Sequence, residues 1–392
     1  MNAGKTGNYF RLVIPCLFVL LARPACAFEW QQNFSSLNYL QFFSNPLYLP
    51  NPKPVSVADW TPTYGLTGQS EAYSLKAVAS ANLMRSSDPT LMVNRADPSL
   101  TLTAAYTGQT TTLSAAFAYS QMTTLPLGVS PVELGQNSYA AADGTRISRT
   151  ATLTWQQELS DLWSLNTSLI SSSIGFNQPG TNQVQQSGFL LASYTQNQLQ
   201  VKLTRTLSPV LSAYAMVHAG SMTVPAESGQ DTWYEVDAGS QWNLNDAWSL
   251  NGYAGVNRTQ NSLVTALVPA TSTTGLSASL SLQRQLEGNL LSLLASQTVQ
   301  GSAYGGVVQT DMVTANWSKA LTDLYQVGAD GFYLQSKTVY QIRQMMADAW
   351  ISRDLTAAWN LKLQIQRVEW MPTGASAVGD NVVGLYLVYS GQ

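Results

Sequence analysis

The stretch LNDAWSLNGYAGV, residues 244–256, joins a polar turn to a segment in which apolar and polar residues alternate. The apolar residues of the segment share one parity: Trp248, Leu250, Ala254 and Val256. The other parity is polar or small: Ser249, Asn251, Tyr253 and Gly255. Strict alternation predicts a β-strand with one apolar and one polar face. The fold then depends on which face points inward.

The turn that opens this stretch recurs along the chain. Its form is Leu, a small polar residue or Glu, a turn residue or Ala, any residue, and then an aromatic residue or Leu. The copies are residues 159–163, 207–211, 244–248, 286–290, 321–325 and 355–359. Each copy lies between two alternating segments, as a tight hairpin turn does. Longer segments rich in Gly, Pro, Asn, Ser and Thr separate the copies, for example residues 176–188 and 223–231. Short turns at one end and long loops at the other are typical of a transmembrane β-barrel.

The alternating segments give a strand count. They are residues 69–83, 98–106, 109–122, 145–158, 162–175, 187–206, 210–220, 231–243, 247–259, 273–285, 290–300, 308–319, 324–335, 342–353, 358–369 and 380–390. This is an even number, as bacterial single-chain barrels require. We therefore predict an all-β, transmembrane antiparallel barrel of about 16 strands over residues 69–392. Eighteen strands is the alternative, if part of residues 28–65 also pairs.

The aromatic residues that end four of the turns share a position. Trp163, Trp248, Tyr325 and Trp359 each enter a strand just beyond a short turn. In a barrel these turns are periplasmic, so the four rings are expected in an interfacial girdle.

A barrel of this size places its apolar face in lipid and its polar face around an aqueous lumen. In WNLKLQI (359–365) and LSASLSL (276–282) the polar parity is therefore the inner one. The predicted pore-lining residues are Lys202, Tyr214, His218, Glu235, Asp237, Asn251, Tyr253, Asp330, Lys362 and Gln364. Charges in this set are few and of both signs, unlike the single-sign rings of ion-selective pores. Amides, hydroxyls and tyrosines suit a neutral solute such as a saccharide. The alternative is that they solvate a wide channel or pack a filled one.

The first residues have the pattern of a secretory signal peptide. Lys5 and Arg11 precede the apolar run Leu12–Leu21, and Ala25-Cys26-Ala27 forms an A-x-A cleavage site. A lipoprotein signal at Cys26 is the alternative. Both cysteines lie within residues 1–27, so no disulfide is expected in the mature chain. Only 10% of residues are charged, the formal net charge is −3, and 45% are hydrophobic. This balance excludes nucleic acid as a partner and, with export, predicts the bacterial outer membrane.

Residues 28–68 differ from the rest in being dense in aromatic residues and proline. Prolines stand at 46, 50, 52, 54 and 62, which disfavours a regular helix or a central strand. We therefore expect an irregular segment, either a plug in the lumen or an arm that docks a periplasmic partner. The alternative is an extended segment along the periplasmic rim.

Little in the sequence suggests an enzyme. His218 is the one histidine, and on a polar lumen wall it is expected to be a solvated side chain rather than a member of a catalytic pair. No Cys/His cluster or EF-hand spacing predicts a metal site, and no cofactor is implied. Acidic residues assigned to loops are expected to be solvated charges, with weak Ca²⁺ binding as the alternative: Asp88, Asp97, Glu133 and Asp143.

The C-terminal Gly384-x-x-Leu387-x-Tyr389 resembles the assembly signal of outer-membrane barrels, departing from it at Val382 and after Tyr389. Together with the hairpin repeat and the sparsely charged lumen, GTRISRTATLTWQQELSDLWSLNTSL (144–169) resembles the barrels associated with bacterial exopolysaccharide secretion and exosortase systems. The resemblance implies passage of a polysaccharide across the outer membrane, with periplasmic export components as partners besides membrane lipid.

Three functional hypotheses follow from the sequence. The first is a channel for saccharide or exopolysaccharide. The second is a general diffusion porin, which should show an inward-folded constriction and rings of charge. The third is a closed structural or enzymatic barrel, which should show a packed lumen or a catalytic pair.

Overall fold

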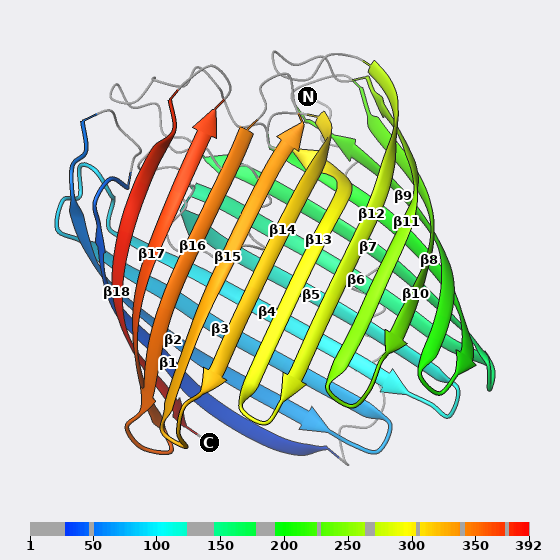
Figure 1. Cartoon of the computed structure of the whole chain (residues 1–392), viewed down its shortest axis with the longest axis horizontal. Helices are drawn as coiled ribbons and strands as arrows, with labels where there is room; N and C mark the ends of the chain where they lie inside the picture. The colour runs from blue at the N-terminus through cyan, green and yellow to red at the C-terminus, as the bar shows by residue number, and fades with distance from the viewer. Residues whose placement is uncertain are drawn as a thin grey trace.

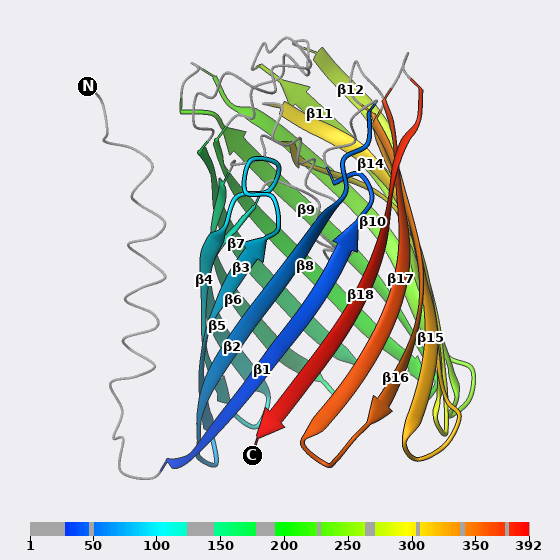
Figure 2. The same ribbon diagram turned by 90° about the vertical axis from the view of Figure 1, so that its left-hand side faces the viewer.

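The computed structural model describes residues 28–46, 51–123, 145–177, 193–225, 229–262, 271–302, 306–337, 342–372 and 376–391. Within these ranges the chain forms one closed antiparallel sheet of eighteen strands, in which β1 pairs with both β2 and β18 (Figures 1 and 2). The strands are β1 Glu29–Phe43, β2 Val55–Gln69, β3 Tyr73–Ser86, β4 Arg95–Thr107, β5 Thr111–Thr123, β6 Thr145–Ser160, β7 Trp163–Asn177, β8 Tyr194–Ser208, β9 Leu211–Thr223, β10 Asp231–Asn243, β11 Trp248–Asn261, β12 Thr271–Leu286, β13 Asn289–Ser302, β14 Gly306–Ala320, β15 Tyr325–Lys337, β16 Ile342–Asp354, β17 Trp359–Pro372 and β18 Val378–Gly391. In the described ranges, no helix is long and apolar enough to cross a membrane.

The sixteen predicted strands correspond to β3–β18, and the strand count is eighteen rather than about sixteen. The extra strands, β1 and β2, come from residues 28–68, so the predicted plug or periplasmic arm is wrong. Pro46, Pro52 and Pro54 fall between β1 and β2, where they interrupt no ladder, and Pro50 lies outside the described residues. Pro62 lies inside β2 opposite Ser36 of β1, and the β2–β3 pairing passes over Thr61 and Pro62. The missing N–H of Pro62 therefore interrupts the ladder only locally. The predicted leader, residues 1–27, lies outside the described residues.

The repeated turns are confirmed as hairpin turns, and three of them share one hydrogen-bond pattern. These three turns are residues 244–248, 321–325 and 355–359. In each, the leucine N–H donates to the carbonyl of the closing aromatic residue, as Leu355 does to Trp359 at 2.8 Å. The residue after the leucine then accepts from two backbone N–H groups. Thr356 Oγ1 accepts from Ala358 and Trp359, each at 3.2 Å. Asn245 and Thr322 do the same in their turns, which explains the small polar residue of the repeat.

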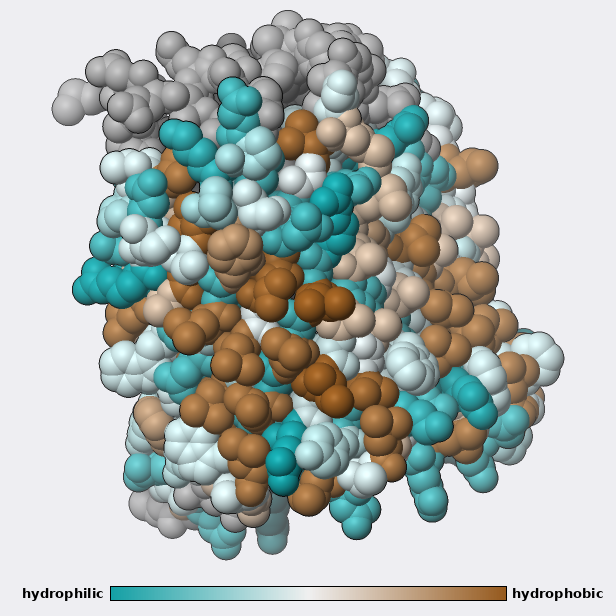
Figure 3. Space-filling view, turned by 60° about the vertical axis from the view of Figure 1, so that its left-hand side comes forward, coloured by the Kyte–Doolittle hydropathy of each residue, from teal (hydrophilic) through white to brown (hydrophobic). Residues whose placement is uncertain are grey.

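The outer surface of the barrel is apolar across its middle, as the alternation predicts (Figure 3). On β17, for example, Leu363 and Ile365 are 47% and 57% exposed, while Gln366 between successive outward residues is buried. The predicted girdle aromatics lie at the short-turn end on this outer face. Trp163, Trp248 and Tyr325 each stack with an arginine of the next strand, and Trp359 packs on Tyr389 with ring centres 4.9 Å apart. This end is therefore the periplasmic one.

The C-terminal strand that carries the proposed assembly signal also closes the barrel. On β18, Val383 and Leu385 face outward with exposures of 46% and 44%. Their partners in β1 are Phe42 and Leu40, which are also exposed. The first and last strands therefore continue the apolar belt without a break.

One pair of neighbouring strands separates before it reaches the extracellular end. The pairing of β12 with β13 runs from Leu286 and Asn289 to Ala278 and Gln297, and it stops there. Above that point β12 continues to pair with β11, and β13 continues to pair with β14. Figure 1 shows the upper part of β13 turning away from β12. We call this separation the β12–β13 seam.

Side chains cover part of the backbone that the seam leaves unpaired. The carbonyl of Leu276 in β12 accepts from Asn257 Nδ2 at 2.9 Å and from Gln309 Nε2 at 3.1 Å. Asn261 Nδ2 of β11 also donates to the carbonyl of Val307 in β14 at 3.1 Å. The end of the β13–β14 hairpin is therefore held against β11 and β12 by amide side chains instead of strand pairing.

The facing of β17 gives a direct test of the barrel in lipid. Replacing Leu363 by Arg places a charge in the apolar belt and should lower the free energy of unfolding by about 2–4 kcal/mol. Replacing Gln364 by Arg adds the same charge on the lumen side and should cost much less. A denaturant titration of protein folded in lipid vesicles measures both, and equal losses would contradict the assigned faces.

Candidate functional site: the lumen wall and its constriction

All ten predicted pore-lining residues lie on the lumen-facing parity of their strands. The register gathers them into two groups on different parts of the wall. The β8–β11 wall holds Lys202, Tyr214, His218, Glu235, Asp237, Asn251 and Tyr253. The β15–β18 wall holds Asp330, Lys362 and Gln364. Their role in transport remains a prediction.

The Tyr214 side chain contacts residues of three neighbouring strands in the β8–β11 wall. Its hydroxyl donates to Asn251 Oδ1 at 3.0 Å, and Lys202 Nζ lies 3.9 Å from the centre of its ring. The ring lies across Gly239 of β10, where a Cβ would stand 2.4 Å from the Gly252 carbonyl oxygen and 2.5 Å from the Tyr214 Cζ. A glycine is therefore needed for this approach, and the lysine charge is held over an aromatic face.

His218 and Glu235 are cross-strand partners on the same wall. Together with Gln198, Gln200 and other side chains they line a lumen cavity of about 200 Å³. Ser168 lines the same cavity, but Gln200 lies between it and His218 in the strand register, so no nucleophile–base pair forms. Within the described ranges, no group of three or more His, Cys, Asp or Glu side chains is placed to hold a metal ion.

The β15–β18 wall combines carboxylates with aromatic rings. Asp330 and Asp348 are cross-strand partners, and Trp350 Nε1 donates to Asp330 Oδ2 at 3.2 Å. Lys362 Nζ lies 4.7 Å from the centre of the Trp350 ring and 5.8 Å from that of Tyr386. The lysine ammonium thus lies beside two aromatic rings on a wall that also carries two carboxylates.

Strand β1 extends this aromatic surface. Tyr39 packs against Tyr386 with ring centres 5.4 Å apart, and Gln41 Nε2 donates to the Tyr386 hydroxyl at 2.6 Å. The sequence reasoning missed Tyr39 and Gln41 because they lie in the segment predicted to be irregular. It also missed Asp348 and Trp350, because Met and Ala occupy both parities of residues 345–349 and blur the alternation.

The end of the β13–β14 hairpin folds into the lumen and packs on the β7–β10 part of the wall. Val299, Val307 and Val308 form a buried cluster with lumen-facing residues of β7–β10, among them Met222 and the fully buried Trp233. The backbone N–H of Gly301 also donates to Gln196 Oε1 of β8 at 3.2 Å. The hairpin therefore narrows the lumen on the extracellular side of the His218–Glu235 cavity.

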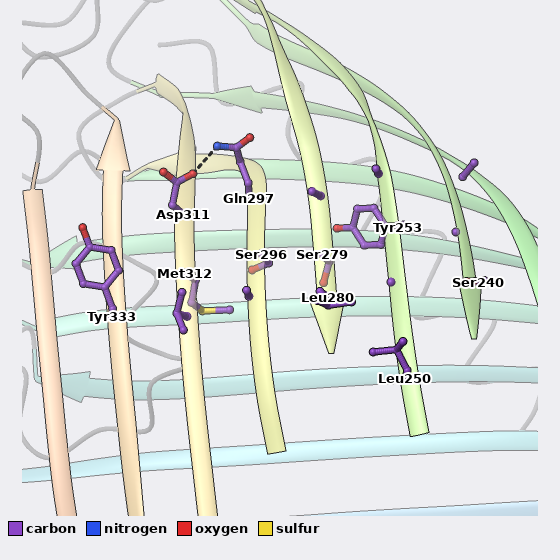
Figure 4. Close-up of a pocket in the computed structure, with 17 residues that line it drawn as sticks. Ser240, Leu250, Tyr253, Ser279, Leu280, Ser296, Gln297, Asp311, Met312 and Tyr333 are labelled. Atoms are coloured by element: carbon purple, nitrogen blue, oxygen red, sulfur yellow. Dashed lines mark hydrogen bonds between the residues drawn. The ribbon is translucent and has the colours of Figure 1, made fainter. Parts of the chain in front are cut away.

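The outer wall is hollowed next to the β12–β13 seam, where a cavity of about 720 Å³ crosses β10–β15 (Figure 4). Small lipid-facing residues line part of it, among them Ala254, Ala278 and Ala295. At its upper edge Gln297 Nε2 donates to Asp311 Oδ1 at 2.7 Å. Polar residues at this height mark the upper limit of the apolar belt on β13 and β14.

Of the loop acids, Asp88 lies between β3 and β4 and accepts from Thr90 Oγ1 at 2.6 Å. Asp97 is not a loop residue but lies in β4, where it forms a buried ion pair with Arg95 at 2.8 Å. Glu133 and Asp143 lie outside the described residues. The prediction of a solvated loop charge is therefore wrong for Asp97.

A closed antiparallel barrel with an apolar belt and a girdle of aromatic residues is the architecture of bacterial outer-membrane proteins. The protein accordingly lies in the bacterial outer membrane. No protein-family model matches the chain, and no curated protein matches it either.

Three solved structures illustrate the structural likeness. OccAB4 of Acinetobacter baumannii is 10% identical with a TM-score of 0.49, covering 92% of this chain and 98% of its own. OpdK of Pseudomonas aeruginosa, crystallised with vanillate, is 6% identical with a TM-score of 0.48 and the same coverage. The outer-membrane channel DcaP of A. baumannii is 12% identical with a TM-score of 0.44, covering 94% and 98%. The class of protein rests on the register and surface of the barrel itself.

The close approach of Tyr214 to Gly239 can be tested by adding one methyl group. Gly239→Ala should displace the ring and lower the free energy of unfolding by about 1–3 kcal/mol. Gly331→Ala in β15 is the control for adding a methyl group to a strand glycine, although it faces the lipid, because a Cβ there meets only the Ala315 carbonyl at 4.0 Å. Urea titrations in lipid compare the two, and equal stabilities would show that the Tyr214 ring is not held against Gly239.

Proposed function

We propose that the protein is an outer-membrane channel for a neutral, hydroxyl-rich solute of the saccharide class. The observation that carries this proposal is the aromatic and amide surface of the β15–β18 wall and β1. There Tyr39, Trp350 and Tyr386 lie on the lumen side of their strands beside Gln41 and Gln364. Tyrosine and tryptophan combine a large apolar face with one polar group. Such a surface suits a ring-shaped solute that has both C–H faces and hydroxyl edges.

The lumen charges support a neutral solute over an ion. Those in described strands are of both signs and are spread over the wall. The cations are Lys76, Arg95, Arg146, Lys202 and Lys362, and the acids are Glu29, Asp59, Asp97, Glu158, Asp231, Glu235, Asp237, Asp330, Asp348, Asp354 and Asp380. Ion-selective pores use rings of one sign at the narrowest point. The excess of acids leads us to expect a modest preference for cations and no strong selectivity.

The general diffusion porin is the second candidate, and the inward-folded β13–β14 hairpin is one of its two expected features. The other feature, a ring of charge beside the constriction, is not formed by the described residues, because His218, Glu235 and Gln198 face the hairpin instead. Passage of exopolysaccharide with periplasmic partners rests on the sequence resemblance alone.

Single-channel recordings test the solute class. The barrel in a planar bilayer should conduct, show only a modest cation preference in a salt gradient, and be blocked by added maltohexaose. Trp350→Ala removes a ring from the proposed surface and should weaken the block about tenfold. Trp317→Ala removes a lipid-facing tryptophan and should leave the block unchanged. Strong selectivity without a block would favour the general porin, and absence of conductance would favour a closed barrel.

The packing of the hairpin gives a separate test of the constriction. Trp233→Ala removes the largest side chain that anchors the hairpin and should raise the conductance. Phe43→Ala is the control, because Phe43 is equally buried in a lumen-facing cluster that excludes the hairpin. Heat-dependent migration in gels checks that both variants fold. Unchanged conductance in folded Trp233→Ala would mean that the hairpin does not limit the pore.

A further inference from the structure

Charged residues are sorted between the two faces of the barrel. In the described strands the lipid-facing side carries nine basic residues: Arg85, Arg149, Arg205, Arg258, Arg284, Lys319, Arg343, Arg353 and Arg367. The acids on that side are Asp311 and Glu369, and Glu369 is paired with Arg367 at 2.9 Å. The lumen side has an excess of acids instead. The outer surface thus has a positive balance although the whole chain has a formal net charge of −3.

The outward arginines occupy the two edges of the apolar belt. At the periplasmic edge Arg205, Arg284 and Arg353 stack on the girdle aromatics. A second set lies near the extracellular ends of the strands: Arg85, Arg149, Arg258, Arg343 and Arg367. Cations at these two levels stand where lipid headgroups meet the barrel. Their long stems can lie on the belt while the charge stays at its edge.

Arg85 differs from the other members of the extracellular set because it borders a hollow. A cavity of about 560 Å³ lies on β2–β4, with Trp60, Leu83 and two small residues, Ala58 and Ala96, on its lipid-facing side. Its volume is within the range of small-molecule sites. The Trp60 indole is fixed, since its Nε1 donates to Ser36 Oγ at 2.9 Å.

The charged and apolar residues of the hollow are arranged in the same order as the headgroup and acyl chains of a lipid in the outer leaflet. Arg85 is exposed at the extracellular side, and Leu83 and Trp60 lie below it toward the middle of the belt. The Arg85 guanidinium makes no ion pair with the described residues. The carboxylate of Asp59, also in the lining, points to the lumen, where it accepts from Thr61 Oγ1 at 3.0 Å. No described acid therefore competes for the arginine on the lipid side.

We propose that this hollow, the β2–β4 site, binds a phosphate-bearing lipid of the outer leaflet. Arg85 receives the phosphate, for which the planar guanidinium provides two parallel donors. Trp60, Leu83 and the space above Ala58 and Ala96 receive an acyl chain. The site needs both parts of the ligand, since the arginine alone is an exposed cation and the hollow alone is ordinary belt surface.

Photocrosslinking locates the site on the full-length barrel. The protein is reconstituted in vesicles that contain a phosphatidate with a diazirine in one acyl chain, and labelled peptides are mapped by mass spectrometry. We expect labelling to be concentrated on β2–β4. Arg85→Gln should reduce that labelling about tenfold, the loss expected for a charge-assisted hydrogen bond. Lys76→Gln removes the same charge from the lumen face of β3 and should have no effect.

Three further arms separate the parts of the ligand. A diazirine diacylglycerol has the chains without the phosphate and should label β2–β4 weakly. Glycerol phosphate has the phosphate without the chains and should not compete. Ala58→Leu fills the hollow and should reduce labelling while leaving Arg85 in place. Even labelling around the belt, equal labelling by diacylglycerol, competition by glycerol phosphate, or equal effects of Arg85→Gln and Lys76→Gln would each overturn the proposal.

Discussion

The hydrogen-bond ladder is the constraint on which the rest of this barrel depends. In lipid no water is available for backbone N–H and C=O groups, so each must find a partner within the sheet. Closure of β1 onto β18 removes the two free edges that an open sheet would have. Once the ladder is closed, the two-residue period of each strand fixes which side chains meet lipid and which meet the lumen. The apolar belt, the aromatic girdle and the two lumen walls all follow from that alternation.

At the β12–β13 seam the hydrogen-bond ladder is interrupted, and the neighbouring side chains compensate for the lost backbone hydrogen bonds. The amides of Asn257 and Gln309 replace the missing strand partner of Leu276. The freed hairpin is stabilised instead by burial of Val299, Val307 and Val308 against Trp233. The missing strand pairing in the wall and the narrowing of the lumen therefore involve the same hairpin.

Sequence reasoning succeeded where the signal is local. The Leu-to-aromatic turns are recognisable because one side chain, such as Thr356, satisfies the turn, and parity predicted the lipid face of β17. It failed for β1 and β2, because the five prolines and the dense aromatic residues of residues 28–68 predicted an irregular segment. It also could not find the Asp330–Asp348 pair or the inward hairpin, because strand register and tertiary packing bring those residues together. The facing of single residues could be predicted from the sequence, but their grouping into the two lumen walls could not.

The pairing of the first strand with the last has a consequence for biogenesis. All other strand pairs join neighbours in the chain, so they can form as local hairpins. The closing contacts join residues such as Ser44 and Asn381, which are 337 positions apart. Such a distant pairing forms late in folding, because the entropy cost of closing the long loop precedes any stabilising contact. Until that pairing forms, β1 and β18 each keep an unpaired edge that can pair with other chains. Both strands must therefore be protected from aggregation until the barrel closes.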